Sequence, residues 1–393
     1  MPMQDEMTID ERRKYVKLMA VRYRKANRQE RSRLLSEMEA VTKQHRKHLI
    51  RLLNGKSLER KKRQTPRSRT YGVEVERVIL KVWESLDYIC AERLTPALHR
   101  TAQHLARFGE VSLTPQLEEQ LQEIGVSTVQ RLLRKHRASK GRLPRKGPER
   151  ANQVTKGVPM RRIPWDTGEP GHFETDLVHH GGESASGEYG YTLQLIDVAT
   201  GWSERVMLLG RGQQAMATAF THVIDRLPFP IKELHPDNGS EFFNQHLVRL
   251  WKEKVSGVQL SRSRPYQKND NRNVEQKNDT LVRHYFGHLR LETPEQVAAG
   301  NGLYERMWVY YNLFQPVMHL VEKTVEGDKV HRKWDDAQTP YQRLLATNVL
   351  RPEQQARLQA LYEQTNPLLL RKEIYAGLAA LWEAALAPSE AAA

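Results

Sequence analysis

Residues 172–179 read HFETDLVH, a run of apolar and β-favouring residues that also holds two carboxylates, Glu174 and Asp176. Such a run predicts a strand. Two similar runs follow, YTLQLID at 191–197 and WSERVMLL at 202–209, and the connecting segments HHGGESASGEYG and VATG are rich in turn residues. Three strands joined in this way predict an antiparallel meander.

The pattern changes after the third strand. Helical spacing runs over 213–226, and the sequence then predicts a strand at 231–235, a helix at 240–254, a short strand at 258–261 and a long helix that begins near Asn271. Strands that alternate with helices favour parallel pairing. The sequence therefore predicts an α/β domain with a mixed five-stranded sheet and helices packed on it.

Three acidic residues lie at positions in or beside this predicted sheet where they could form a catalytic or metal-binding site. Asp176 lies in the first strand, Asp237 follows the fourth strand in HPDNGSEF, and Glu275 lies in the first turns of the long helix. A carboxylate in a strand costs free energy unless it is paired or bound to a metal ion, and DNG is a tight-turn sequence. Together the three residues could surround a hard divalent cation, which prefers oxygen ligands.

The segments ETDLV, HPDNGSEF and KNDNRNVEQKN, in this order, resemble the catalytic core of DDE transposases and retroviral-type integrases, which have a ribonuclease H-like fold. The resemblance is strongest to bacterial insertion-sequence transposases. It covers about residues 165–345, including the downstream segments YYNLFQPVMHL and TPYQRLL. The resemblance implies that Asp176, Asp237 and Glu275 are the catalytic residues and the metal ligands.

The same resemblance implies an enzyme, a polynucleotidyl transferase with two Mg²⁺ or Mn²⁺ ions in each active site. Such an enzyme hydrolyses a phosphodiester at each transposon end and then transfers the strand into target DNA, without a covalent protein intermediate. The implied partners are double-stranded DNA and further copies of the chain, as a dimer or tetramer on DNA. The alternatives are a transposase-derived DNA-binding regulator that no longer cleaves, and a plain ribonuclease H-like nuclease.

The charge of the chain is divided unevenly. The whole chain has 62 Lys and Arg against 47 Asp and Glu, a net charge of +15. Residues 1–150 hold 35 basic and 18 acidic residues, a net +17, whereas residues 171–300 hold 14 basic and 16 acidic residues, a net −2. This division predicts that the first half binds a polyanion and that the second half has a different role.

Residues 1–56 contain three segments with helical spacing. Leu18 and Val41 belong to the apolar positions of the first two. The third segment, expected from Lys43 to Leu53, has leucines on one face and basic residues on the other, which predicts a first helix-turn-helix DNA-binding domain. The candidates for DNA contact in it are Lys43, Arg46, Lys47 and Arg51.

Residues 73–140 form a second helical group, with helices expected at 73–86, 95–108 and 115–124 and a last helix that starts at Ser127 as N-cap. This group predicts a second helix-turn-helix DNA-binding domain. For both groups the alternative is ordinary amphipathic helices with solvated basic faces. The candidates for DNA contact in the last helix are Gln130, Arg131 and Arg134.

Two basic segments without helical spacing, 57–72 and 141–165, are expected to be linkers. The first contains ERKKRQTPRSR, which we interpret as a linker that contacts phosphates, with a nuclear localisation tract as the alternative. The catalytic core is expected at 166–300 and a helical region at 301–393. In the core, the candidates for DNA contact are Arg262, Arg264, Lys268, Arg272 and Lys277, with a merely solvated loop as the alternative.

Four polar residues near the candidate site have simpler expected roles. Glu174 is expected to be solvated or salt-bridged, although it shares a strand face with the candidate metal ligand two residues later. His179 and His180 lead into a glycine-rich turn and are expected at the surface. Asp197 ends the second strand and is expected to cap the turn into ATGW.

The composition excludes several classes of protein. A single cysteine, Cys90, cannot form an intrachain disulfide or a thiolate zinc site. The first residues, MPMQDEMTIDERRK, lack the apolar stretch of a secretion signal, and no apolar run reaches the roughly 18 residues that cross a membrane. We therefore expect no membrane partner and a cytoplasmic protein. The resemblance to bacterial insertion-sequence transposases implies a bacterial, nucleoid-associated one.

Overall fold

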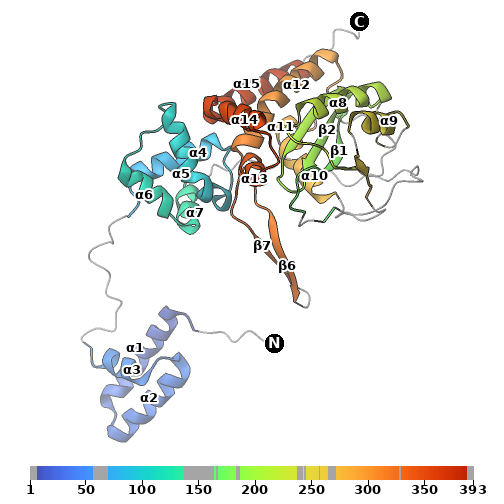
Figure 1. Cartoon of the computed structure of the whole chain (residues 1–393). Coiled ribbons are helices and arrows are strands. Elements are labelled where there is room, and N and C mark those ends of the chain that lie inside the picture. Colours follow the sequence, from blue (N-terminus) through green and yellow to red (C-terminus); the bar gives the residue numbers. More distant parts are fainter. Residues whose placement is uncertain are drawn as a thin grey trace. The chain divides into compact units, whose positions relative to one another are not determined.

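The chain divides into two compact units, Met1–Thr70 and Tyr71–Ala393, in the computed structural model (Figure 1). Within its described residues no helix is both long and apolar enough to span a membrane. The residues that the structure describes are 7–55, 70–136, 163–164, 167–182, 186–236, 242, 245–255, 257–263, 271–326 and 329–386.

The first unit is a group of three helices around one apolar cluster. A capping box starts its first helix, because the side chain of Thr8 accepts from the amide of Glu11 while the Glu11 carboxylate accepts from the amide of Thr8. The three segments are helical, as the sequence predicts. They are α1 (Ile9–Lys25), α2 (Arg28–Thr42) and α3 (Arg46–Leu53). The buried apolar residues are Val16, Met19, Ala20, Ala26, Leu34, Leu35, Met38, Leu49 and Leu53.

Two details of this unit differ from the sequence prediction. The third helix begins at Arg46 and not at Lys43, because Lys43 adopts a left-handed conformation with φ of 56° and ends α2. Leu18 and Val41 were expected on apolar stripes, yet they are 66% and 43% exposed. Three short helices bury only the centre of each stripe, so residues at its edges stay in solvent.

The second unit is built on a mixed five-stranded sheet with the strand order β3-β2-β1-β4-β5. The three sequential strands β1, β2 and β3 pair antiparallel, whereas β4 pairs parallel to β1 and β5 pairs parallel to β4. The predicted meander and the predicted mixed five-stranded sheet are therefore confirmed. The strands are β1 (His172–His180), β2 (Gly190–Asp197), β3 (Ser203–Leu209), β4 (Glu233–Pro236) and β5 (Gln259–Leu260).

The two faces of this sheet carry different side chains. One face buries Phe173 and Leu195 in a cluster that includes Phe220 of α8 and Trp251 of α9. Because side chains alternate along a strand, Glu174, Asp176 and Val178 belong to the other face. That face is covered by α10 and α12, and α15 packs against α12. The helices named here are α8 (Gln213–Arg226), α9 (Gln245–Lys254), α10 (Arg272–Lys277), α12 (Pro294–Val309) and α15 (Pro367–Leu386).

The helix predicted to begin near Asn271 is not a uniform α-helix. The α10 segment continues without a break into a π-helical segment, η1 (Asn278–Arg283), and then into a last turn, α11 (His284–Phe286). A π-helical turn contains more residues than an α-helical turn, so it changes which side chains face the sheet. The long helix that the sequence predicts is therefore present but is not a regular α-helix beyond Lys277.

The C-terminal region, predicted to be helical over 301–393, also contains a two-stranded hairpin of β6 (Leu320–Glu326) and β7 (Lys329–Trp334). The prediction missed a β-type signal, because LVEKTVEGDKVHRKW has β-branched residues on both sides of a Gly-Asp pair that is typical of a hairpin turn. The helix α12 begins at Pro294, before the expected boundary. The remaining elements are η2 (Tyr310–Phe314), α13 (Pro340–Ala346) and α14 (Pro352–Gln364).

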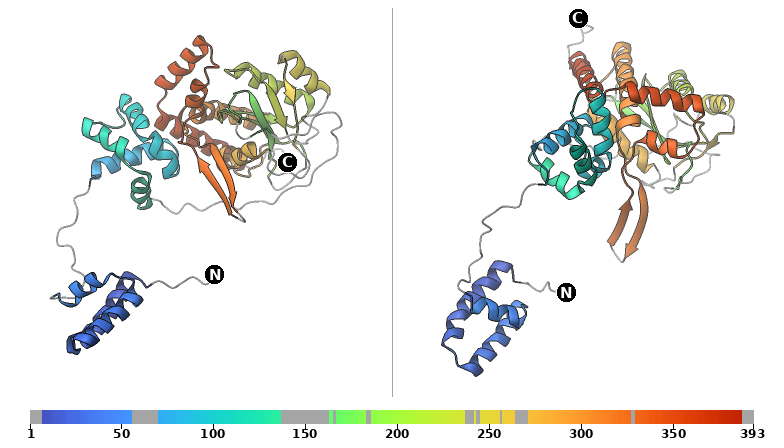
Figure 2. Two further views of the ribbon diagram at one scale, coloured as in Figure 1. Left: turned by 60° about the horizontal axis from the view of Figure 1, so that its bottom comes forward. Right: turned by 60° about the vertical axis from the view of Figure 1, so that its left-hand side comes forward.

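A group of four helices, α4–α7, precedes the sheet in the second unit. Two of them differ from prediction: α5 begins at Ala91, one turn before Thr95, and α7 is capped by Gly125, so that Ser127 lies inside the helix. The helices are α4 (Val73–Ser85), α5 (Ala91–Arg107), α6 (Pro115–Glu123) and α7 (Val126–Arg134). They lie beside the C-terminal helices, as the two views of Figure 2 show.

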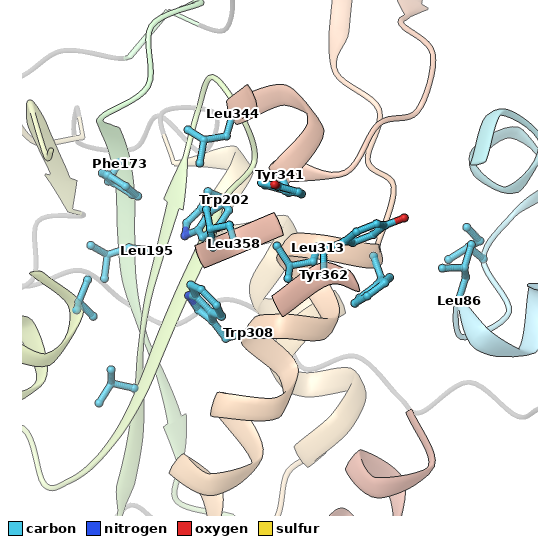
Figure 3. Packing of buried hydrophobic residues seen from close by; sticks show 14 of the residues in the cluster. Leu86, Phe173, Leu195, Trp202, Trp308, Leu313, Tyr341, Leu344, Leu358 and Tyr362 are labelled. Atoms are coloured by element: carbon cyan, nitrogen blue, oxygen red, sulfur yellow. The ribbon is translucent and has the colours of Figure 1, made fainter. Parts of the chain in front are cut away.

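The four-helix group and the sheet share one apolar cluster. Figure 3 shows how this cluster extends from Phe173 on β1, through Trp202 and Trp308, to Tyr362 and Leu86. The aromatic residues of the C-terminal elements therefore fill the space between the sheet and α4–α7. The sequence suggests a separate domain at 73–140; the part of it that the structure describes, 73–136, belongs to the same compact unit as the sheet.

Asp87, in the turn between α4 and α5, binds two other elements of this unit, α15 and α11. It adopts a left-handed conformation with φ of 59°, and its carboxylate accepts hydrogen bonds from Arg371 Nε (2.9 Å) and Tyr375 Oη (2.9 Å) of α15. It also accepts one from Tyr285 Oη of α11 at 3.0 Å. Asp87 thus fixes the four-helix group to both the C-terminal helix and the end of the segment that carries Glu275.

We expect Asp87→Ala to lower the free energy of unfolding of this unit by about 3–5 kcal/mol, since it leaves the buried guanidinium of Arg371 without its carboxylate. All 7 tryptophans of the chain follow residue 70, so tryptophan fluorescence during urea unfolding reports on this unit alone.

The matched control is Asp225→Ala, which removes an exposed carboxylate on α8 and is expected to change the free energy of unfolding by less than about 0.5 kcal/mol. Equal effects of the two substitutions would contradict the assigned role of Asp87.

Candidate active site

The central strand β1 carries Asp176 on the face that α10 covers. Asp176 is half-buried and stands opposite Gln194 of β2 in the antiparallel register. Its Oδ1 accepts a hydrogen bond from the amide of Leu177 at 2.8 Å, and its Oδ2 accepts one from Asn278 Nδ2 at 2.6 Å. The carboxylate is therefore held between the strand and the segment that follows α10.

Glu174, two residues earlier on the same face, is buried and binds the N-terminal end of α10. Its Oε2 accepts hydrogen bonds from the amides of Asn273 (2.7 Å) and Val274 (3.0 Å), and its Oε1 accepts one from Asn273 Nδ2 at 2.8 Å. Burial raises the pKa of Glu174 to about 7, and these hydrogen bonds oppose the rise. The expectation that Glu174 is solvated or salt-bridged is wrong, because its side chain is buried and binds backbone amides. Local sequence could not indicate this, since the partners lie about a hundred residues away.

Glu275 lies on α10 directly after the buried Val274, and its own side chain is exposed. Asn278, which binds Asp176, comes three residues later and is therefore a neighbour of Glu275 on the helix surface. The structure thus brings Asp176 and Glu275 to one region of the sheet. One lies on the central strand and the other on the helix that this strand anchors.

Asp237, the third candidate carboxylate, lies outside the described residues. The preceding residue, Pro236, is the last of β4 and stands opposite Thr175 in the parallel register with β1. Thr175 in turn precedes Asp176. Among the residues that the structure does describe, no group of three His, Cys, Asp or Glu side chains is arranged to hold a metal ion.

Two side-chain oxygens beside Asp176 are buried and accept no hydrogen bond from any described residue. They are Oδ1 of Asn278 and Oε1 of Gln194. The amide of Asn278 has its nitrogen toward Asp176, so turning it over would set its oxygen against a carboxylate. Unsatisfied oxygens next to carboxylates suit a hard cation or its bound water, and this donor set therefore fits a divalent metal ion.

The basic residues predicted around the core loop have different environments. Arg264 and Lys268 lie outside the described residues. Arg262 is buried, with 8% of its surface exposed, and so does not offer a solvated charge. Arg272 and Lys277 are half-buried at the two ends of α10, and Lys277 Nζ lies 5.1 Å from the centre of the Tyr311 ring.

The basic residues predicted for α3 are only partly available for DNA. Lys43, Lys47 and Arg51 are exposed. Arg46 is half-buried and binds α2, because its guanidinium donates to Ser36 Oγ at 3.0 Å and to Ser32 Oγ at 2.7 Å. Arg46 therefore holds two helices of the first unit together.

The residues predicted on α7 all lie on its outer face. Gln130, Arg131 and Arg134 are exposed, whereas Val129 and Leu133 are buried against the other helices of the group. Their helical spacing and their exposure agree with the amphipathic pattern in the sequence.

The sequence analysis missed or misjudged several residues that border the site. His180, expected at the surface, is buried and contacts Thr192 Oγ1 at 2.7 Å, and burial lowers its pKa to about 3. Asn278 could have been predicted as a site residue, since it lies about one helical turn after Glu275. Asp197 caps its turn as predicted, because it accepts from the amide and hydroxyl of Thr200.

The fold and the candidate site define an α/β protein with a mixed five-stranded sheet and carboxylates on its central strand. The chain belongs to the same family as the uncharacterized protein y4rM of Sinorhizobium fredii (strain NBRC 101917 / NGR234). The two are 35% identical over 337 residues, which cover 84% of this chain and 94% of y4rM. No protein-family model matches the chain.

A solved structure similar to this chain is the catalytic core domain of BIV integrase. It has 19% sequence identity and a TM-score of 0.30, and the match covers 45% of this chain and 95% of the integrase core.

We expect Glu174→Ala to loosen the start of α10, since the amides of Asn273 and Val274 lose their acceptor. A lost buried acceptor costs about 1–3 kcal/mol, so the exchange of these two amide hydrogens should accelerate roughly 10- to 100-fold. Hydrogen exchange followed by NMR or mass spectrometry measures this.

Glu174→Gln keeps one acceptor oxygen and should give a smaller acceleration than the alanine variant. Exchange at Asn273 and Val274 that is unchanged in Glu174→Ala would show that this carboxylate does not anchor the helix.

Proposed function

We propose that this chain is a metal-dependent DNA transposase or integrase, in which Asp176, Asp237 and Glu275 form the catalytic site. The observation that carries the proposal is the hydrogen bond from Asn278 to Asp176, because it draws together the strand with one candidate carboxylate and the helix with another. The parallel β4 strand, which ends one residue before Asp237, supports the same assignment.

The three carboxylates would bind two Mg²⁺ or Mn²⁺ ions, which, when bound, activate the attacking hydroxyl and stabilise charge on the leaving oxygen. The protein residues hold the ligands in place. Glu174 fixes α10 by its N-terminal amides, and Asn278 orients the Asp176 carboxylate. The buried oxygens of Asn278 and Gln194 add acceptors for water at the same site.

The reaction would be hydrolysis of a phosphodiester at a transposon end, followed by attack of the released 3′-hydroxyl on target DNA. No nucleophilic side chain is required, and the only cysteine of the sequence, Cys90, lies in the four-helix group. Double-stranded DNA would be bound by the exposed faces of α3 and α7 in helix-turn-helix manner. Integration of two ends requires that copies of the chain act together, as a dimer or tetramer on DNA.

Support for a role in DNA binding comes from the exposure of basic residues on both helices. Lys43, Lys47 and Arg51 are exposed in the first unit, and Arg131 and Arg134 are exposed on α7. These side chains match the net charge of +17 in residues 1–150, where 35 residues are basic and 18 are acidic.

We expect Asp176→Asn and Glu275→Gln each to lower Mg²⁺-dependent strand transfer by at least about 100-fold, because each removes a ligand charge while keeping the shape of the side chain. The substrate is a duplex that bears the inverted repeats flanking the coding region, and labelled products joined to target DNA are measured on a sequencing gel. Chelation of the divalent metal should stop the reaction.

The matched control is Glu253→Gln, an exposed carboxylate on α9, which should transfer strands at the rate of the unmodified chain. Near-normal activity of either site variant would show that the site is assigned wrongly. Salt-dependent, specific binding without Mg²⁺-dependent nicking by the unmodified chain would favour the DNA-binding regulator.

A further inference from the structure

The β6–β7 hairpin stands away from the body of the second unit, as Figures 1 and 2 show. Four successive residues of β7, from His331 to Trp334, are exposed. Because neighbouring side chains in a strand point to opposite faces, a run of exposed residues means that this part of the ribbon is uncovered on both faces. Trp334 of β7 is 47% exposed, and Val321 on the facing strand β6 is 51% exposed.

The base of the ribbon is fixed. Val317 and Gln338 exchange two backbone hydrogen bonds, of 2.8 and 3.1 Å. Asp335 Oδ1 accepts from the amide of His319 at 2.7 Å, and its Oδ2 accepts from Arg343 Nη1 of α13 at 2.7 Å. The ribbon is thus fixed at its base by hydrogen bonds and an ion pair, and it projects from there.

The base also lies next to the candidate active site. Val317 is buried in one cluster with Val274, the residue that precedes Glu275 on α10. A duplex with a phosphodiester at the carboxylates would therefore pass near the start of the ribbon. The strands of the ribbon are long enough, at about 20 Å, to follow such a duplex for part of a helical turn.

The cross-strand register gives the two faces of the ribbon different compositions. On one face the acidic Glu322 stands opposite the basic Lys333, and both are exposed. The charges of this face compensate one another, so it has little attraction for a polyanion.

The other face has no acidic position in the described register. It places Lys323 opposite Arg332, Val325 opposite Val330, and Leu320 opposite Trp334. Together with an exposed tryptophan, this basic and apolar composition is complementary to a phosphate backbone and its bases.

We propose that the face of the β6–β7 ribbon that carries Arg332 and Trp334, and not Lys333, is a DNA-binding site that contacts the duplex held at the candidate active site. A two-stranded ribbon fits the major groove of B-DNA, and arginine and lysine side chains on it reach phosphates and base edges. This inference rests on the proposed function in one respect, since it takes DNA as the substrate of the chain.

The test compares Arg332→Ala with Lys333→Ala, because these neighbours on β7 are both exposed and basic but belong to opposite faces. The full chain binds a fluorescein-labelled mixed-sequence DNA duplex in buffer with EDTA, and anisotropy gives the dissociation constant at several salt concentrations. Arg332→Ala should weaken binding roughly fivefold or more and lower the salt slope by about 1. Lys333→Ala should change binding by less than about twofold and leave the slope unchanged.

A direct readout comes from a photocrosslinker, p-benzoylphenylalanine, in place of Trp334 or of Lys333. The crosslinker at position 334 should form a covalent adduct with the DNA, and that at position 333 should give a much weaker one. Crosslinking of position 334 only to a second copy of the chain would overturn the proposal, and so would unchanged binding of Arg332→Ala.

The two proposals fail in different ways, because the binding assay contains no divalent metal. If Arg332→Ala binds like the unmodified chain while strand transfer proceeds, the ribbon assignment alone is wrong. If the ribbon variants lose binding but the unmodified chain shows no Mg²⁺-dependent cleavage, the enzymatic function alone is wrong. If the unmodified chain does not bind the duplex, both are wrong.

Discussion

The carboxylate of Glu174 is the contact on which the candidate site depends. It is buried beneath α10 and accepts from two amides at the start of that helix, where backbone donors have no partner within the helix. A negative group at this position also interacts favourably with the helix dipole. Since the helix is fixed at its first residues, Asn278 meets Asp176 one turn later.

The π-helical segment follows directly after α10. Asn278 at its start binds Asp176 on the central strand, and Val282 and Phe286 are buried further along in an apolar cluster with residues of α12 and α15. A regular α-helix repeats every 3.6 residues, and the wider turn of η1 changes the direction of the side chains after Lys277. The turn that follows, α11, carries Tyr285, which binds Asp87, so one continuous run of chain connects the candidate site with the four-helix group.

Local patterns sufficed for much of this fold but not for its polar interior. Alternation and turn residues gave the meander and the cap at Asp197, whose hydrogen-bond partners in Thr200 lie only three residues away. Glu174 and His180 were misjudged because distant segments cover them. Glu174 binds the amides of Asn273 and Val274, and the ring of Phe286 packs against His180. A polar residue in a strand looks solvated until such segments are known. The β6–β7 hairpin was missed because its signal, although local, lay in a region interpreted as helical.

The position of α4–α7 relates the uneven charge of the chain to its structure. These helices belong to the same compact unit as the sheet, and Asp87 joins them to α11 and α15. If α7 binds DNA, as we propose, the duplex is therefore held at a fixed place relative to Glu275. The slightly acidic composition of residues 171–300, with 14 basic against 16 acidic residues, then suits a segment that must bind cations before it can approach a phosphate. A site of this kind needs basic surfaces beside it, and the exposed face of α7 supplies one within the same unit.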